Sequence, residues 1–201
     1  MKALIKDYLL VLLVMGALAL LFLLCIRTRS NTFLFLLSVL ILLPNVYAFV
    51  FCVPFIPTPM AAVEMILEAA GLKPGDIVYD IGCGDGRIVY LAVKKYGVKG
   101  TGFELSPVVY LLAKARQLLW RSQACIKFGN IKQQDLSGAD VIFCYLYPQV
   151  MRELEPKLMA EMKKGARLIS HDYPLPSWKE KTVIDSTAGI LPCKFWVYEK
   201  E

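Results

Sequence analysis

The sequence predicts an α/β domain built on a doubly wound, mostly parallel sheet, preceded by an N-terminal hydrophobic helical hairpin. Three observations support this prediction. From residue 77 to residue 170, apolar runs of strand length alternate with helical patterns, as expected for parallel strands that are joined by helices. A glycine-rich turn follows the first of these strands. Two long runs without any charged residue occupy most of the first 53 residues.

The two uncharged runs cover residues 8–26 and 32–53. As a helix, the 19 residues of the first run would span about 28 Å, which is close to the thickness of a bilayer core. A cleaved signal peptide is the alternative for the first run, and a re-entrant or interfacial helix broken at Pro44 is the alternative for the second. We therefore predict a membrane anchor over residues 1–53, with one or two spans, and a folded domain over residues 54–201.

Composition limits the partners that we expect for the domain. The chain has 201 residues and a net charge of +6, to which the first 60 residues and the remainder contribute equally. No block of basic residues alternates with aromatic ones, so we expect no nucleic-acid partner. The six cysteines are scattered without a C-x-x-C pair, and His171 is the only histidine. This pattern favours buried free thiols in a reducing compartment and no metal site.

The domain begins with a stiff, proline-rich linker over residues 55–59, before a helix over residues 60–70 that Gly71 ends. Ser106 and Pro107 have the residue types that begin a helix, as N-cap and first helical residue. The predicted strands cover residues 77–81, 98–104, 124–128, 141–146 and 166–170, the further helices cover residues 87–96, 107–120 and 149–163, and a terminal hairpin covers residues 181–184 and 193–198. The strand over residues 141–146 is apolar on both faces, which predicts a central place in the sheet.

The turn after the first strand reads Asp80-Ile-Gly-Cys-Gly-Asp-Gly-Arg87. Its alternating glycines remove side chains where a ligand would approach the backbone, and the next helix directs its unpaired N–H groups at the turn. Asp80 ends the first strand, and Glu104 ends the second strand about two dozen residues later, where it is placed to bind a ribose. The arrangement predicts a nucleotide-type cofactor site, with an ordinary glycine-rich turn as the alternative.

Two features of this turn argue against a dinucleotide. The spacing is G-x-G-x-G instead of G-x-G-x-x-G, and Asp85 lies inside the turn. Carboxylates would repel a pyrophosphate, whereas a cofactor that carries an ammonium and a sulfonium group would be attracted. The turn resembles motif I of class I S-adenosylmethionine (SAM) methyltransferases, and Glu104 matches their ribose-binding acidic residue.

Further candidate residues follow the later strands. Asn130 stands where methyltransferases place an Asp or Asn against the adenine, and an ordinary Asx turn is the alternative. Tyr145 and Tyr147 end the fourth strand and are expected to shape a channel for an amine, because aromatic faces tolerate a developing cation. Plain strand-end tyrosines are the alternative. His171 beside Asp172 suggests a general base, and the alternative is a His–Asp pair at the rim of the pocket.

From about residue 57 to residue 178 the chain resembles one family more specifically. It is similar to the family that holds the lysine N-methyltransferases of the adenine nucleotide translocase and of the ATP synthase c-subunit, with prokaryotic relatives. The motifs that carry the resemblance occur in order as Pro57-Thr-Pro59, Asp80-Ile-Gly-Cys-Gly-Asp-Gly-Arg87, Gly102-Phe-Glu-Leu-Ser-Pro107, Asp135-Leu-Ser137, Tyr145-Leu-Tyr-Pro148, Leu154-Glu-Pro-Lys-Leu158, Gly165-Ala-Arg-Leu-Ile-Ser170 and Pro174-Leu-Pro-Ser-Trp178.

This resemblance implies a seven-stranded class I methyltransferase fold, SAM as methyl donor and N-methylation of a lysine in a membrane protein. The hydrophobic hairpin is a departure from the mitochondrial members, and it leaves the substrate open. The second departure is Asn130, because class I enzymes more generally have Asp there. The family's cofactor-binding residues correspond to Asp80, Gly82, Gly84, Gly86, Glu104 and Asn130.

SAM is made in the cytosol, so we expect a domain that faces the cytoplasm and is anchored in the lipid bilayer through the N-terminus. The anchor suits a protein substrate whose lysine lies near the membrane surface. Two alternatives remain open. One is a methyltransferase for lipid headgroups or quinones, and the other is a SAM-binding membrane assembly factor without turnover.

Overall fold

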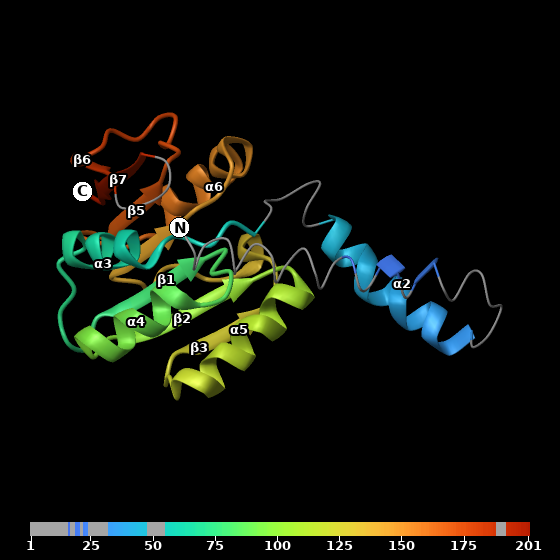
Figure 1. Cartoon of the computed structure of the whole chain (residues 1–201). Coiled ribbons are helices and arrows are strands. Elements are labelled where there is room, and N and C mark those ends of the chain that lie inside the picture. Colours follow the sequence, from blue (N-terminus) through green and yellow to red (C-terminus); the bar gives the residue numbers. More distant parts are fainter. Residues whose placement is uncertain (1–15, 17–18, 21, 24–31, 48–54, 188–191) are drawn as a thin grey trace.

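The computed structural model describes residues 16, 19–20, 22–23, 32–47, 55–187 and 192–201. After the linker, a seven-stranded sheet forms the centre of the domain, and helices cover both of its faces (Figure 1). The strand order is β3-β2-β1-β4-β5-β7-β6. The first five strands in this order are parallel to one another, and β7 is antiparallel to both β5 and β6. The prediction of a doubly wound, mostly parallel sheet with a terminal hairpin is confirmed.

The element boundaries agree with the sequence prediction to within two residues in the domain. The strands are β1 (Ile77–Ile81), β2 (Lys99–Glu104), β3 (Cys125–Phe128), β4 (Val141–Cys144), β5 (Arg167–His171), β6 (Thr182–Ser186) and β7 (Cys193–Glu199). The helices are α2 (Thr32–Tyr47), α3 (Met60–Ala69), α4 (Arg87–Tyr96), α5 (Pro107–Trp120) and α6 (Pro148–Glu161), with a short 3-10 helix η2 (Ile131–Gln133). Ser106 is the N-cap of α5 as predicted, and its Oγ accepts a hydrogen bond from the Val109 amide.

Strand β4 is the centre of the core, between β1 and β5, and each of its four residues is buried. Val141 and Phe143 point to one face of the sheet, where they pack with residues of α3 such as Ile66. Ile142 points to the other face and packs with Leu154 of α6. Burial of both faces explains why this strand is apolar throughout. The carboxyl ends of β1, β2, β4 and β5 consequently meet at one edge of the sheet.

The predicted membrane hairpin falls largely outside the described residues. Helix α2 matches the start of the second uncharged run, carries no charged residue and continues through Pro44 to Tyr47. Within the described part of the chain, no helix has both the length and the apolar character that a membrane crossing requires. The anchor over residues 1–53 therefore stays a prediction.

Candidate cofactor and acceptor site

The predicted site residues gather at the carboxyl edge of the parallel strands. In the β1–β4 pair, Asp80 lies opposite Phe143, so the turn after β1 adjoins the segment after β4. The contact is close, because a Cβ atom built on Gly82 would lie 2.8 Å from Leu146 Cδ2. The glycine turn and the Tyr145–Tyr147 segment therefore form two sides of one site.

Asp80 is a buried acidic residue of this edge with an incomplete set of hydrogen bonds. Its side chain is 2% exposed, and its Oδ2 atom has no hydrogen-bond partner among the described residues. Burial raises the pKa of the Asp80 carboxyl to about 8, and the neighbouring carboxylates of Glu104 and Asp85 contribute to the same direction. An unpaired buried carboxylate is costly. A positively charged ligand group at Asp80 would remove this cost, so the site fits the ammonium-bearing cofactor that the sequence predicts.

Glu104 connects the two turns that follow β1 and β2. Its Oε2 atom accepts a hydrogen bond from the Gly84 amide at 2.9 Å, and its Oε1 atom accepts one from the Ser106 amide at 2.8 Å. Burial raises the pKa of Glu104 to about 7, although both of these hydrogen bonds favour the charged form. Each carboxylate oxygen has a further lone pair, so the ribose contact remains chemically available and stays a prediction.

The glycines of the turn serve packing within the protein. Gly84 has a φ of +57°, and a Cβ atom there would lie 2.5 Å from the ring of Phe55 in the linker. A Cβ atom on Gly86 would meet the ring of Tyr90 at the same distance. We predicted that the glycines leave room for a ligand. At Gly82, Gly84 and Gly86 the atoms that occupy the space beside the backbone belong to Leu146, Phe55 and Tyr90.

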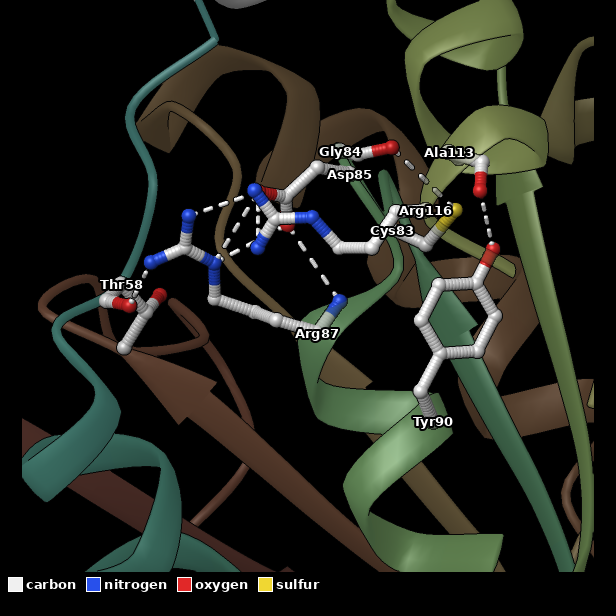
Figure 2. Close-up of polar contacts among 8 residues, drawn as sticks. All are labelled: Thr58, Cys83, Gly84, Asp85, Arg87, Tyr90, Ala113 and Arg116. Atoms are coloured by element: carbon white, nitrogen blue, oxygen red, sulfur yellow. Dashed lines mark hydrogen bonds and ion pairs between the residues drawn. The ribbon is translucent and has the colours of Figure 1, made fainter. Parts of the chain in front are cut away.

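Asp85 lies between two arginines, an arrangement that we did not predict from the sequence (Figure 2). Arg87 Nε donates to Asp85 Oδ1 at 2.9 Å, and Arg87 Nη2 donates to Oδ2 at 2.6 Å. Arg116 Nη1 of α5 lies 3.0 Å from the same Oδ2 atom. Two guanidinium groups compensate the Asp85 charge, so we correct its predicted role in repelling a pyrophosphate. Attraction for a cationic cofactor depends mainly on Asp80 and Glu104.

The proline-rich linker is part of the site. Arg87 Nη1 donates to the Thr58 carbonyl at 2.7 Å, as Figure 2 shows. The buried Thr58 hydroxyl lies 3.5 Å from Nδ1 of His171, at the end of β5. Because β4 lies between β1 and β5, Thr58 crosses over the end of β4. From the sequence we predicted the linker only as a domain boundary. The available signal was that Pro57-Thr-Pro59 is among the motifs of the resemblance.

The ends of β4 and β5 carry a cluster of rings. The Tyr145 and His171 rings are tilted by 30° with centroids 4.0 Å apart, and the Tyr173 ring stacks on Tyr145 at 6.4 Å. Tyr147, which is 36% exposed, packs edge to face against Tyr173 at 6.2 Å. Both predicted tyrosines therefore belong to one cluster. Tyr173 was not among the predicted residues, although its position directly after β5 places it at this edge.

His171 is held on every side. Its other face contacts the Phe195 ring at 4.8 Å, and its Nε2 atom lies 3.7 Å from Asp172 Oδ2. Burial lowers the pKa of His171, which opposes the effect of the Asp172 carboxylate. Both ring nitrogens face protein side chains, so this geometry favours a positioning role over the predicted general base.

The other predictions have mixed outcomes. Asn130 Oδ1 accepts a hydrogen bond from the Lys132 amide at 2.9 Å. This bond forms the Asx turn that was the alternative interpretation, and the contact of Asn130 with the adenine stays a prediction.

Cys83 and Cys144 are buried free thiols as expected, but Cys125 is exposed because it lies on the edge strand β3. The expectation of no metal site stays untested, since potential ligand atoms of His171, Asp172 and Cys193 lie within 4.8 Å of one another.

The sheet order and the acidic ends of β1 and β2 define a class I methyltransferase fold. A solved RNA methyltransferase from Salinibacter ruber, in complex with S-adenosyl-L-homocysteine, superposes with a TM-score of 0.67 at 29% identity and covers 71% of this chain and 92% of that chain. The family model described as the ANTKMT methyltransferase domain matches residues 80–182. The chain belongs to this family, so the predicted resemblance and the methyltransferase class are confirmed.

Similar proteins with known names support the assignment of the chain to this methyltransferase family. A protein-lysine N-methyltransferase of Saccharolobus islandicus is 37% identical over 149 residues, which are 73% of this chain and 92% of that protein. The adenine nucleotide translocase lysine N-methyltransferase of mouse is 34% identical over 152 residues. That match covers 73% of this chain and 63% of the mouse enzyme, so the mouse protein has a large part without a counterpart in the match.

Proposed function

We propose that the protein transfers a methyl group from SAM to the side-chain amine of a lysine in a protein, and that this substrate is a membrane protein. Family membership and the names of the relatives support the reaction. The observation that carries the proposal is the edge where β1 and β4 adjoin. Asp80, whose Oδ2 atom has no hydrogen-bond partner among the described residues, lies on one side of it, and the tyrosine cluster lies on the other.

The cofactor side of this edge fits SAM by its charge. Asp80 and Glu104 would hold the cofactor, while Gly82, Gly84, Gly86 and Asn130 would line its binding site. When bound, SAM supplies an electrophilic methyl group on a positively charged sulfur. Because both carboxylates have raised pKa values in the free protein, a cationic ligand would shift them toward the ionised form.

The acceptor side must favour a neutral amine. A lysine with a pKa of about 10.4 is almost entirely protonated at pH 7, and its lone pair is then unavailable for in-line attack. The rings of Tyr145, Tyr147 and Tyr173 would desolvate the amine and so lower its pKa. Their π faces would then stabilise the charge that develops on the nitrogen.

We also propose that the chain is anchored in the membrane through residues 1–53, with the domain in the cytoplasm. The uncharged sequence of α2 and of the run before it supports this location. Anchoring restricts the domain to a thin layer at the bilayer surface, where it raises the effective concentration of a membrane-protein lysine.

The test uses the full-length protein in detergent with methyl-labelled SAM and membranes of its own host. After reaction, protein and lipid extract are separated. We expect label in a discrete protein band, which disappears when one lysine of that protein is substituted. At a SAM concentration near the Kd of the unmodified protein, the Asp80→Asn variant should give much less label, whereas a variant of the exposed Asp135, Asp135→Asn, should label normally. Label confined to the lipid phase would establish the lipid or quinone alternative, and SAM binding without any label would indicate an assembly factor.

A further inference from the structure

Helix α5 exposes an apolar face. Leu111, Leu118 and Leu119 are 64%, 79% and 81% exposed, and their spacing of seven and eight residues puts them on one side of the helix. The buried residues Val109 and Ala113 occupy the opposite side, toward the sheet. A row of exposed leucines on a helix that already has a buried face indicates a second surface that contacts something outside the domain.

The edge strand β3 extends this apolar face. Phe128 is 54% exposed, and its ring lies 5.6 Å from the ring of Tyr110 on α5. We call the surface formed by Leu111, Leu118, Leu119 and Phe128 the α5–β3 face.

The charge around the α5–β3 face is of one sign. Residues 105–134 contain five basic residues and no Asp or Glu. Two of the five have acidic partners elsewhere, because Arg116 pairs with Asp85 and Lys132 pairs with Glu153. Of the other three, Lys114 and Arg121 are exposed on α5 and at its C-cap, beside the leucines. Lys127 points to the opposite face of the sheet, where its Nζ lies over the Phe103 ring. Leucines surrounded by cations are typical of a surface that inserts shallowly into an anionic lipid layer.

Helix α2 lies on the same side of the domain. It contacts α5, and from there it extends away from the sheet (Figure 1). Helix α2 has no charged residue and exposes Leu36, Leu40 and Leu43. The helix that carries the exposed leucines of the domain therefore contacts the apolar helix α2.

We propose that the α5–β3 face lies on the surface of an anionic lipid bilayer, with its leucines in the interfacial layer and its cations at the headgroups. Charge complementarity and the contact of α5 with the apolar helix α2 support a bilayer as the occupant. Nucleic acid would use the same cations but gives no reason for the leucines. Because α5 follows Glu104 after two residues, this contact would hold the carboxyl edge of the sheet near the membrane. The proposal depends on the surface alone and not on the nature of the methyl acceptor.

The test measures the depth of α5 in the bilayer. The full-length Leu119→Trp variant is reconstituted in liposomes of phosphatidylcholine and phosphatidylglycerol with brominated acyl chains, and the fluorescence of the three native tryptophans is subtracted. We expect the emission of the introduced tryptophan to be blue-shifted and to be mostly quenched by the bromine atoms. The matched control is Met159→Trp, at an exposed position of α6 on the opposite face of the sheet, and its added emission should not be quenched.

A charge-reversal variant distinguishes the possible occupants. Lys114→Glu and Arg121→Glu together should abolish the quenching of the Leu119→Trp emission. Absence of quenching in the variant with native charges would overturn the proposal. If the emission is not quenched and the protein binds single-stranded RNA tightly, the face binds nucleic acid. If the emission is not quenched and the protein forms a dimer that Leu118→Glu dissociates, the face binds a second copy of the chain. Because fluorescence is the readout, failure here would leave the methyl-transfer proposal intact.

Discussion

The two sides of the site are built from different chemistry. On the cofactor side, at the ends of β1 and β2, buried carboxylates are held by backbone amides and by arginines. On the acceptor side, at the ends of β4 and β5, aromatic rings contact one another in tilted and edge-to-face pairs. Leu146 joins the two sides through its contact with Gly82.

This difference shows how each side is preorganised. A buried charge without partners is unstable, so the protein fixes Asp85 with two arginines and leaves Asp80 for a ligand. Rings can desolvate an amine without carrying a charge of their own. We therefore expect variants of the cofactor side to have larger effects than variants of the acceptor side.

The largest effect should come from Arg87→Ala. This change leaves the buried Asp85 with Arg116 alone and removes the donor to the Thr58 carbonyl. Removing one partner of a buried ion pair costs about 3–5 kcal/mol of unfolding free energy. Denaturant unfolding of both proteins in the same detergent measures this loss of unfolding free energy. The control is Arg152→Ala on the exposed face of α6, and equal stability of the two variants would contradict the role of Arg87.

The two sides should respond to pH in opposite directions. Asp80 has a pKa of about 8 in the folded protein and 3.8 unfolded, so the folded state binds more protons and stability falls as pH rises between these values, by at most about 1.4 kcal/mol per unit. For His171 the folded pKa lies below 6.5, so stability falls as pH drops through that value. Unfolding temperatures measured against pH should show a smaller first slope in Asp80→Asn, where Glu104 with its raised pKa still contributes, and a smaller second slope in His171→Gln.

Asp80→Asn should weaken SAM binding by about 10- to 100-fold, because a charge-assisted hydrogen bond contributes about 1.5–3 kcal/mol. Calorimetric titration of the full-length protein with SAM measures this change. Asp135→Asn, at an exposed turn, is the matched control and should bind normally. An unchanged affinity of Asp80→Asn for SAM would contradict the proposal that this carboxylate binds the cofactor.

On the acceptor side, Tyr145→Leu should reduce kcat by about 2- to 10-fold while SAM affinity stays constant. The estimate follows from the loss of an aromatic pair of about 0.5–1.5 kcal/mol with His171. Single-turnover methylation and SAM titration measure the two quantities separately. A large loss of SAM affinity in this variant would show that the two sides are not separable.

An effect no larger than that of Tyr145→Leu should come from Thr58, which contacts residues of both sides. Thr58→Val keeps the shape and removes the hydroxyl that faces His171, whereas Thr58→Ser keeps the hydroxyl. A neutral hydrogen bond contributes about 0.5–1.5 kcal/mol, so we expect about a 2- to 10-fold lower kcat in Thr58→Val and recovery in Thr58→Ser. Equal kcat values in both variants would limit Thr58 to its carbonyl contact with Arg87.

Local sequence patterns were sufficient to predict the domain fold and to group the candidate site residues at one edge of the sheet. Strand and helix periods, the Ser106 cap and the glycine turn are such patterns, so they located each element to within two residues. Parallel strands bring their carboxyl ends to one edge, which is why Asp80, Glu104, Tyr145 and Tyr147 could be grouped from their places in the sequence.

The atoms that these side chains face depend on the three-dimensional arrangement of the elements. The pairing of Asp85 with Arg116 and the contact of Thr58 with His171 join residues that lie 31 and 113 positions apart. The ring contact of Tyr145 with His171 depends likewise on the neighbouring places of β4 and β5. Local patterns carry no information about such pairs, because side-chain contacts across a sheet follow from strand order and packing.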